Sequence, residues 1–239
     1  FTDASGNALA YYLWPDYNSS SARLTVRLEG ADQSGALVIW YGHPTATTTS
    51  DGDATFILHD HFDGSSVNDT KWQVPSSSNS GTLSISDSQA HISGSGGWQN
   101  LVSESSYGPG VTAEFYGSAT TDENYIQIGF GDTFPASTDN YAILSTANGR
   151  YYQTREIGDA SETLTTRSDL LSTPARWSIS LTGTSVIYKR NGVVKATHTS
   201  PLQTFPFGFS TSGQVLHIDY ALVRAYSATP PTLVSSSMV

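Results

Sequence analysis

The stretch "SVIYKRNGVVKATH", residues 185–198, contains two alternating apolar and polar runs that are separated by Asn191-Gly192. Alternation with a period of two is typical of a β-strand that has one buried and one exposed face. Asn-Gly is the dipeptide preferred by type I′ turns, because both central residues of such a turn have positive φ angles. The stretch therefore predicts an antiparallel β-hairpin.

Runs of the same kind recur along the chain and are interrupted by Gly, Pro, Asn, Asp and Ser, while helical periodicity is almost absent. They lie at 22–29, 82–86, 111–116, 125–130, 141–146, 150–156, 176–183 and 215–226, whereas 36–42 is a continuous apolar run, typical of a strand covered on both faces. Short strands with turn signals about every eight to twelve residues are typical of sandwiches and barrels. We therefore predict an all-β chain, folded as an antiparallel β-sandwich or jelly roll.

Composition excludes several classes of protein. The formal net charge is −10, and the 11 Lys and Arg residues form no cluster, which argues against a nucleic-acid partner. The chain has no cysteine, so disulfides and thiolate metal sites are excluded. No run of about 20 apolar residues is present, so the sequence predicts no membrane span. Glycosylation-type triplets at Asn18 and Asn68 are compatible with secretion.

The chain divides at a connector rich in Pro, Thr, Gly and Asp, "GHPTATTTSDGDATF", residues 42–56. We expect a small β-sandwich domain over residues 1–53 and a larger jelly roll over residues 54–227. Residues 228–239 leave the last strand through a Pro-Pro pair and are expected to form an extended tail.

Two groups of motifs resemble a known family. The chain opens with "FTDASG" and continues to "IWYGHPTATTTSDGDATF", residues 39–56, which resembles a domain of unknown function in archaeal and bacterial surface proteins. The hallmark of that domain, "YYGNP-A-S-S-GD-TF", is matched here by Trp40, Tyr41, Gly42, Pro44, Ala46, Ser50, Gly52, Asp53, Thr55 and Phe56. In that family a concanavalin A-like, laminin-G-like jelly roll follows. "HDHFDGSSVNDTKW" (59–72) and "HIDYALVRAY" (217–226) resemble its opening and closing patterns.

The resemblance also implies that the small domain is incomplete at its N-terminus, because the family's domain normally begins with two further strands. Either the chain is partial or another molecule supplies those strands. A sheet with an open edge readily accepts another strand. Thr232, Leu233 and Val234 form a short β-prone run in the tail, which we expect to be able to add to such an edge on a neighbouring copy. Head-to-tail addition would build a filament, because the contact need not close.

The stretch "FILHDHFDG", residues 56–64, raises the question of a metal site. Read as a strand, it places His59 and His61 side by side on one face, a spacing that can give two imidazoles to one zinc ion. The preferred interpretation is simpler, namely two exposed strand histidines. "SDGD", residues 50–53, lacks the spacing of a calcium loop and is interpreted as a tight turn.

Asp60 and Asp219 each lie among apolar neighbours, where a bare carboxylate is costly unless it is paired or metal-bound. The resemblance to concanavalin-like jelly rolls implies both as ligands of one structural calcium ion. The alternative is that each accepts hydrogen bonds from the backbone or from a basic side chain such as Lys71 or Arg224.

A binding face is predicted from alternation in three strands. If Val111, Ala113, Phe115, Ile126, Ile128 and Phe130 face the core, the residues between them face outward. The resulting candidates for carbohydrate binding are Glu114, Tyr116, Tyr125, Gln127, Tyr151, Gln153 and Arg155. Tyrosine rings can stack on sugar rings, and planar polar groups can bind their hydroxyls. The alternative is an ordinary solvated sheet.

Catalysis is not expected. Glycoside hydrolysis generally needs two carboxylates about 5–10 Å apart, whereas "VTAEFYG" offers only Glu114 and "YIQIGFG" offers none. No Gly-x-Ser-x-Gly elbow is present. We therefore predict a non-enzymatic extracellular surface protein for adhesion or recognition, which binds carbohydrate as a lectin does. The alternative is a structural subunit of an extracellular filament or sheath assembled by strand exchange, and a glycan hydrolase is the third interpretation.

Overall fold

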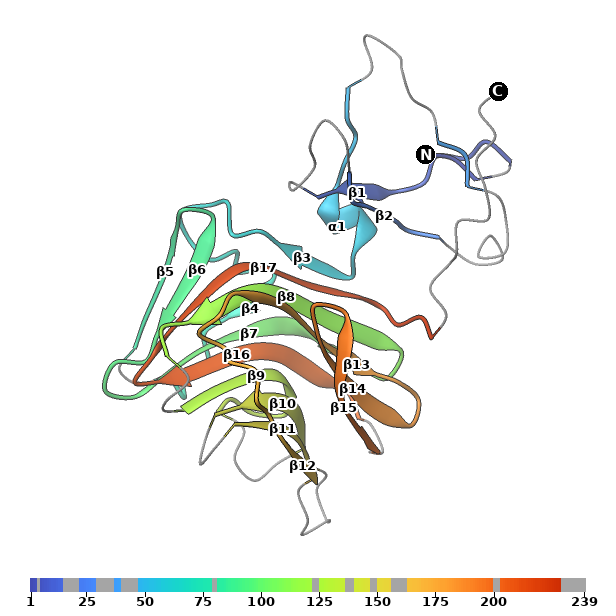
Figure 1. Cartoon of the computed structure of the whole chain (residues 1–239). Coiled ribbons are helices and arrows are strands. Elements are labelled where there is room, and N and C mark those ends of the chain that lie inside the picture. Colours follow the sequence, from blue (N-terminus) through green and yellow to red (C-terminus); the bar gives the residue numbers. More distant parts are fainter. Residues whose placement is uncertain are drawn as a thin grey trace. The chain divides into compact units, whose positions relative to one another are not determined.

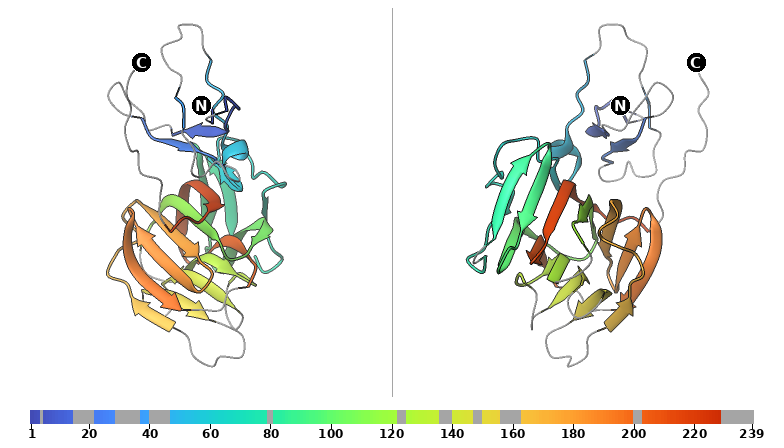
Figure 2. Two further views of the ribbon diagram at one scale, coloured as in Figure 1. Left: turned by 90° about the vertical axis from the view of Figure 1, so that its right-hand side faces the viewer. Right: turned by 60° about the vertical axis from the view of Figure 1, so that its left-hand side comes forward.

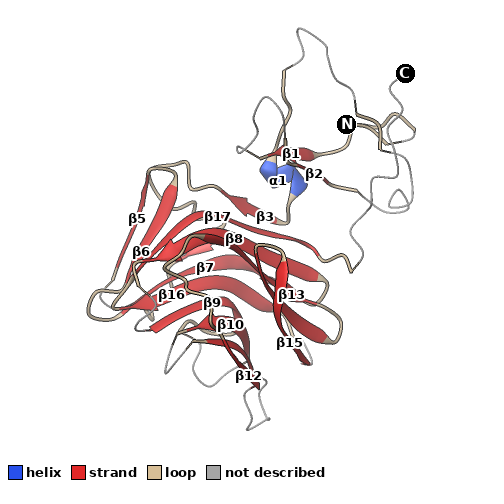
Figure 3. Ribbon diagram, viewed as in Figure 1, coloured by secondary structure: helices blue, strands red, loops and turns tan. Residues whose placement is uncertain are grey.

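The computed structural model describes residues 1–3, 5–14, 22–28, 37–39, 47–78, 81–121, 125–135, 140–146, 150–155, 163–199 and 203–228. Regular structure in these residues is almost entirely β-strand, as Figure 3 shows. The chain divides into two compact units, Phe1–Asp60 and His61–Val239. No helix in the described ranges has the length and apolar character needed to cross a membrane.

The smaller unit contains the antiparallel pair β1 (Tyr11–Leu13) and β2 (Leu24–Val26), the short helix α1 (Gly52–Thr55) and β3 (Leu58–Asp60). The side chain of Asp51 caps α1 by accepting a hydrogen bond from the Ala54 amide at 3.0 Å. "SDGD" is therefore the start of a helical turn, and the prediction of a simple tight turn is wrong. Residues 40–46 of the predicted family motif lie outside the described residues.

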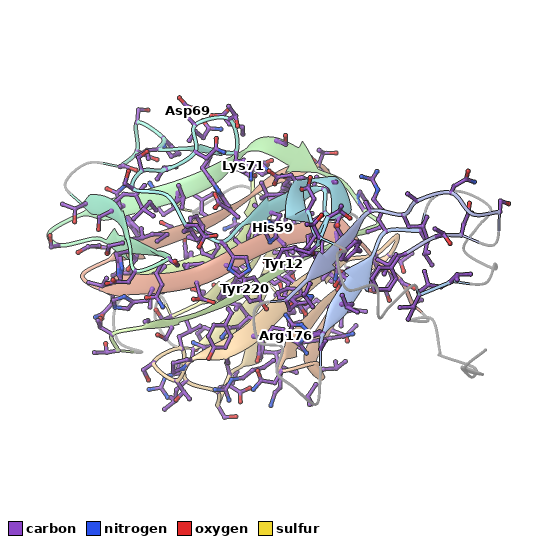
Figure 4. The ribbon with its side chains drawn as sticks, turned by 90° about the horizontal axis from the view of Figure 1, so that it is seen from above. Tyr12, His59, Asp69, Lys71, Arg176 and Tyr220 are labelled. Atoms are coloured by element: carbon purple, nitrogen blue, oxygen red, sulfur yellow. The ribbon has the colours of Figure 1, made fainter. Side chains whose placement is uncertain are left out.

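An aromatic cluster forms the core of the smaller unit. Trp14 and Phe56 are buried, and the ring centroid of His59 lies 4.5 Å from that of Tyr12 (both labelled in Figure 4) and 5.4 Å from that of Phe56. His59 is thus a buried core residue, because it stacks on aromatic rings. The interpretation of His59 as an exposed strand residue is wrong.

Most of the described residues of the larger unit lie in β-strands. Their bounds are β4 (Trp72–Gln73), β5 (Thr82–Ser86), β6 (Gln89–Ser93), β7 (Trp98–Tyr107), β8 (Val111–Ala119), β9 (Tyr125–Gly131), β10 (Tyr141–Ser145), β11 (Tyr151–Arg155), β12 (Thr163–Thr166), β13 (Ala175–Leu181), β14 (Ser185–Arg190), β15 (Val193–Thr199), β16 (Phe205–Ser212) and β17 (Val215–Ala225).

These strands form two sheets of a sandwich. Sheet I has the order β15-β14-β13-β8-β17-β6-β5, and sheet II has the order β12-β11-β10-β9-β16-β7-β4 (Figures 1 and 2). Neighbouring strands in both sheets are antiparallel. The chain passes from sheet I to sheet II between β8 and β9, which is the long-range strand exchange of a jelly roll. The predicted all-β, antiparallel jelly-roll sandwich is confirmed.

Contacts between the sheets identify the inward face of each strand. The ring of Phe115 on β8 meets that of Phe209 on β16 edge to face, with centroids 5.5 Å apart. At another point of the interface, the Tyr188 hydroxyl on β14 donates a hydrogen bond to the Gln153 carbonyl on β11 at 2.6 Å. Phe115, Phe209 and Tyr188 therefore face the core, and so do the side chains that pair with them across neighbouring strands. Of the predicted inward residues, Ala113, Phe115, Ile126, Ile128 and Phe130 are buried, whereas Val111, at the start of β8, is partly exposed.

The hairpin at 185–198 is confirmed. β14 and β15 pair antiparallel, and the intervening Asn191 and Gly192 have φ angles of 49° and 82°. Both angles are positive, as a type I′ turn requires.

A β-bulge in β17 changes which residues of this strand face outward. The pairing register with β8 shifts between Ile218 and Tyr220, so Asp219 has no partner there. Ile218 pairs with Gly117 and faces the core, whereas Tyr220 pairs with Tyr116 on the outer face. Without the bulge, Tyr220 would share the face of Ile218.

Candidate functional site

The predicted carbohydrate-binding residues do not form one surface. Glu114 and Tyr116 belong to β8 in sheet I, whereas Tyr125 and Gln127 belong to β9 in sheet II. The outer faces of the two sheets of a sandwich point in opposite directions. The prediction of a single face is therefore wrong, because it treated β8 and β9 as neighbours in one sheet.

On sheet I, Glu114 belongs to an internal network. Its Oε1 accepts a hydrogen bond from the Tyr220 hydroxyl at 3.0 Å and lies 3.9 Å from the Nε of Arg176. The ring of Tyr116 stacks on that of Tyr220, with 17° between the ring planes, and Figure 4 labels Tyr220 and Arg176. The hydrogen bond and ion pair hold the buried Glu114 carboxylate in place. Both of these contacts are with other side chains of sheet I.

On sheet II, the outer face carries a row of polar side chains at one level of the register. Asn100, Ser210, Gln127, Ser145 and Tyr151 are successive partners across β7, β16, β9, β10 and β11. We call these residues the polar row. All except Tyr151 are buried, with exposures between 0% and 7%.

Hydrogen bonds fix one end of the polar row. The Ser210 hydroxyl donates to the Oδ1 of Asn100, and the Nδ2 of Asn100 donates to the Ser77 hydroxyl at 3.1 Å. Ser77 in turn donates to the Phe134 carbonyl at 2.6 Å. The backbone amide of Asn100 donates to the Ser78 hydroxyl at 3.1 Å. Because both ends of its side-chain amide have partners, Asn100 is held in one orientation.

An aromatic row lies next to the polar row. Ser212 on β16 pairs with Trp98 on β7 and with Tyr125 on β9, so the two aromatic residues flank a small one. Their ring centroids are 5.7 Å apart with 56° between the planes. Tyr125 is 45% exposed and Trp98 is partly exposed. We call Trp98, Ser212 and Tyr125 the aromatic row.

The remaining predicted residues lie on the same face as these rows. Tyr151, Gln153 and Arg155 alternate along β11 with Tyr152 and Thr154, which face the core. Their cross-strand partners on β10 are Ser145, Ile143 and Tyr141. Sheet II therefore brings together Tyr125, Gln127, Tyr151, Gln153 and Arg155, which is the larger part of the predicted set.

Sequence reasoning missed Trp98, Asn100, Ser210 and Ser212, because it did not identify β7 or β16 as strands. In β7, the inward residue Gln99 is polar and hides the alternation. In β16 a signal was available, since Phe205, Phe207 and Phe209 alternate with Pro206 and Gly208 and are all buried. That alternation predicts a strand with Ser210 and Ser212 facing outward.

No acidic pair lies in the central strands of this face. β9, β10, β11, β12 and β16, all of which the structure describes, contain no Asp or Glu, and β7 contains a single acid, Glu104. Asp132, which follows β9, accepts a hydrogen bond from the Nδ2 of Asn140 at 2.8 Å. These strands therefore lack the paired carboxylates on which glycoside hydrolysis generally depends.

The proposed calcium ligands lie in different units. Asp60 ends β3 in the smaller unit, Asp219 occupies the bulge of β17 in the larger unit, and both are partly exposed. Within the described part of the chain, no group of three or more His, Cys, Asp or Glu side chains is placed to hold a metal ion. Carbonyl oxygens also bind calcium. Calcium binding by Asp60 and Asp219 therefore stays a prediction.

Two further predictions concern the C-terminal tail and His61. Thr232, Leu233 and Val234, the expected donor strand, lie outside the described residues. His61 does not continue β3, and its ring centroid lies 5.5 Å from that of Tyr220 in the larger unit. His61 is partly buried, so the interpretation of two exposed strand histidines fails here as well.

Comparison with known proteins matches the N-terminal part of the chain to a family. Residues 1–75 match the model of a domain of unknown function, DUF2341. The match is consistent with the resemblance predicted for this region. A search of curated proteins found no significant sequence match.

Solved structures share the fold at low sequence identity. One of these structures comes from work on endo-acting O-glycanases, which prominent members of the human gut microbiota express to initiate mucin breakdown. It has a TM-score of 0.55 and 11% sequence identity to this chain, and the match covers 72% of this chain and 100% of that chain. A β-1,3-glucanase from Mycobacterium marinum has a TM-score of 0.55 and 13% identity, with coverages of 70% and 98%. Rv0315, described as a pseudo β-1,3-glucanase of Mycobacterium tuberculosis, has a TM-score of 0.54 and 11% identity, with coverages of 72% and 99%. At these identities the similarity establishes the fold alone.

Proposed function

We propose that the chain binds carbohydrate through the outer face of sheet II. The observation that carries the proposal is the aromatic row, in which Trp98 and Tyr125 flank Ser212 beside a row of buried polar side chains. Aromatic rings offer a large, rigid apolar surface to the apolar face of a sugar ring. On the same face, the partly exposed Tyr151 and Arg155 offer a hydroxyl and a guanidinium group to the sugar hydroxyls.

Two properties of the polar row favour a built binding surface over an ordinary solvated sheet. Gln127 and Ser145 are buried although they point away from the core, and Asn100 is held by hydrogen bonds at both ends of its amide. A solvated sheet needs no such fixed groups. A floor of fixed polar groups beside the aromatic row keeps this part of the face rigid, so less conformational entropy is lost when a ligand binds.

We propose binding without hydrolysis. The lack of an acidic pair supports it, because β9, β10, β11 and β16 contain no Asp or Glu and β7 contains only Glu104. A glycosidase generally needs two carboxylates that flank the scissile bond. The proposed setting is extracellular, at a cell surface, where a non-catalytic glycan-binding module would serve adhesion or recognition. The known structures of this fold suggest β-1,3-glucan and mucin O-glycans as the first ligands to test.

The test is binding of purified chain to laminarin, to released mucin O-glycans and to a panel of other polysaccharides, by affinity electrophoresis and then calorimetry. We expect Trp98→Ala and Tyr125→Ala each to weaken binding of the recognised glycan about tenfold, the value of one lost aromatic contact. Tyr116→Ala is the matched control. Tyr116 is also an outward tyrosine, 38% exposed against 45% for Tyr125, but it lies on sheet I.

Two outcomes would overturn the proposal. One is unchanged binding in both sheet II variants with loss of binding in Tyr116→Ala. The other is no binding to any member of the panel. A reducing-end assay on the same samples tests the non-enzymatic part separately, because release of new reducing ends that tracks the protein through purification would show hydrolysis.

A further inference from the structure

Two histidines face each other on the outer surface of sheet I, away from the proposed carbohydrate face. His91 on β6 and His217 on β17 are direct cross-strand partners, and both are partly exposed. Their Nδ1 atoms are 2.8 Å apart, and their ring centroids are 5.0 Å apart with 82° between the planes. Ser84 is the partner of His91 on β5, and Ser118 is the partner of His217 on β8. The imidazoles therefore stand between two small hydroxyl residues.

The hydrogen bonds of His91 determine where its lone pair lies. Its Nε2 is 3.2 Å from the Ser86 carbonyl oxygen, and a carbonyl oxygen can only accept. The Nε2 of His91 must therefore carry the hydrogen, which leaves the lone pair of a neutral ring on Nδ1. His217 then donates its Nδ1–H to that lone pair across the 2.8 Å contact.

This arrangement is that of a metal-binding histidine. Imidazoles that bind a metal ion almost always donate their second ring N–H to a carboxylate, a carbonyl or water, which fixes both the tautomer and the ring orientation. The Ser86 carbonyl does this for His91. We propose that His91 and His217 form a site for one divalent transition-metal ion, bound through both Nδ1 atoms, with Cu²⁺ preferred over Ni²⁺ and Zn²⁺.

The separation of the two nitrogens supports the order of preference. With metal–nitrogen distances of about 2.0 Å, cis positions of a square-planar ion are about 2.8 Å apart, and tetrahedral positions are about 3.3 Å apart. The observed 2.8 Å suits the square-planar ions Cu²⁺ and Ni²⁺ without widening, whereas Zn²⁺ requires the rings to separate. The affinity order of divalent ions also places Cu²⁺ first.

Binding requires two small changes. The rings must tilt until both lone pairs point at one position, and His217 must exchange its Nδ1–H tautomer for the Nε2–H form. Because one proton leaves Nδ1 and one is gained at Nε2, a neutral pair releases no net proton. The other coordination positions are left to water, since no third His, Cys, Asp or Glu joins the pair among the residues that the structure describes. The site is therefore open and exchangeable.

The environment favours the uncharged form that a metal needs. Burial lowers the pKa of His217, and the neighbouring His91 lowers it further. Metal binding competes with protons, because the ligand is the deprotonated nitrogen. Affinity is therefore expected to fall as the pH is lowered.

The test is titration of the tag-free full chain with CuCl₂, NiCl₂ and ZnCl₂ by calorimetry at neutral pH, with electron paramagnetic resonance of the copper form. We expect one Cu²⁺ ion per chain, with hyperfine structure from two nitrogens. His91→Gln and His217→Gln should each weaken binding at least about tenfold, because one ligand cannot chelate. His61→Gln removes another histidine of the larger unit and should bind like the wild type.

Three results would overturn the proposal: no Cu²⁺ bound by the wild type, unchanged binding in the His91→Gln/His217→Gln double variant, or loss of binding in His61→Gln. Circular dichroism checks that each variant is folded. A second measurement needs no variant, since substoichiometric Cu²⁺ should broaden the NMR signals of the His91 and His217 rings before those of any other histidine. Earlier broadening of another histidine would contradict the assignment.

Discussion

The rings of Trp98 and Tyr125 lie 5.7 Å apart, on strands that flank the strand of Ser212. Both rings are at least partly exposed on the same face. If the two rings and the residue between them form the binding surface, a bulky side chain at position 212 should block the ligand while both rings remain. We predict that Ser212→Leu weakens glycan binding about tenfold, as much as the loss of one ring, in calorimetric titrations.

The stability of the same variant provides the control. Ser212 is partly exposed and points outward, so its replacement should change the free energy of unfolding by less than about 1 kcal/mol. Ser178→Leu changes an equivalent outward serine on β13 of sheet I and should leave glycan binding intact. Loss of binding in Ser178→Leu would show that the effect does not come from the space between Trp98 and Tyr125.

Position 52 has room only for glycine, because the ring of His59 lies directly against it. A Cβ atom at position 52 would lie 2.1 Å from the Nδ1 of His59, whose ring is held between Tyr12 and Phe56. We predict that Gly52→Ala destabilises the smaller unit by about 1–3 kcal/mol, the usual cost of overpacking. Hydrogen exchange of peptides from residues 47–60, followed by mass spectrometry, measures this locally.

A double-mutant cycle separates the clash from other effects of the added methyl group. In a His59→Ala background the obstacle is gone, so Gly52→Ala should cost much less there than in the wild type. Gly183→Ala is the control, because a Cβ atom there meets nothing within 4 Å. Equal costs of Gly52→Ala in both backgrounds would contradict the assigned contact.

The strands that could be predicted are those whose alternation is local. The hairpin of β14 and β15 and the inward residues of β8 and β9 follow from period-two patterns and from Asn191-Gly192, which act within a few residues. The division of β8 and β9 between two sheets depends on partners that are distant in the chain, such as β17 for β8 and β16 for β9. No local pattern contains that information.

The candidate site was predicted only in part for the same reason. Tyr125, Gln127 and Tyr151 were identified because their strands alternate cleanly. Trp98 was not, since the inward position next to it holds the polar Gln99. The bulge at Asp219 shows a second limit, because one inserted residue reverses the face of every residue that follows, and the sequence carries no signal for it.

The hydrogen bond from Tyr220 to Glu114 is predicted to stabilise sheet I. Tyr220→Phe removes the hydroxyl that lies 3.0 Å from the Glu114 carboxylate and leaves the buried acid with Arg176 at 3.9 Å. Hydrogen bonds to charged groups contribute about 1.5–3 kcal/mol, so we expect a loss of that size in denaturant unfolding. Tyr116→Phe, at the exposed neighbour that stacks on Tyr220, should cost less than about 0.5 kcal/mol. Equal costs would show that the hydroxyl of Tyr220 contributes nothing specific.

Removal of divalent ions tests the calcium prediction for Asp60 and Asp219. A bound ion raises the free energy of unfolding by about 2.7 kcal/mol at a concentration one hundred times its dissociation constant. We expect EDTA to lower the melting temperature, Ca²⁺ alone to restore it, and Asp60→Asn and Asp219→Asn each to abolish the response. Restoration by Cu²⁺ and not by Ca²⁺ would assign the effect to the His91 and His217 pair instead. A melting temperature that EDTA does not change would reject the calcium site.

The last prediction concerns the buried His198 on β15. Its Nδ1 lies 2.9 Å from the Thr154 hydroxyl and its Nε2 lies 2.8 Å from the Thr165 hydroxyl, so both ring nitrogens are engaged by neutral groups. Burial lowers the pKa of His198 below its ordinary value of 6.5. The unfolded chain therefore takes up this proton at a higher pH than the folded chain, and protonation favours unfolding.

The stabilising contribution of a neutral His198 is complete above the unfolded pKa, about 6.5, and is lost as the pH falls from there toward the folded pKa. We predict that the free energy of unfolding, measured with urea, falls between pH 7.5 and pH 5, and that it falls less in His198→Gln. Carboxylates titrate in both proteins, so the difference between the two pH profiles isolates the histidine. Burial lowers the pKa of His217 as well, so the double variant with His217→Gln should be flatter still. Parallel profiles for the wild type and His198→Gln would contradict the assignment.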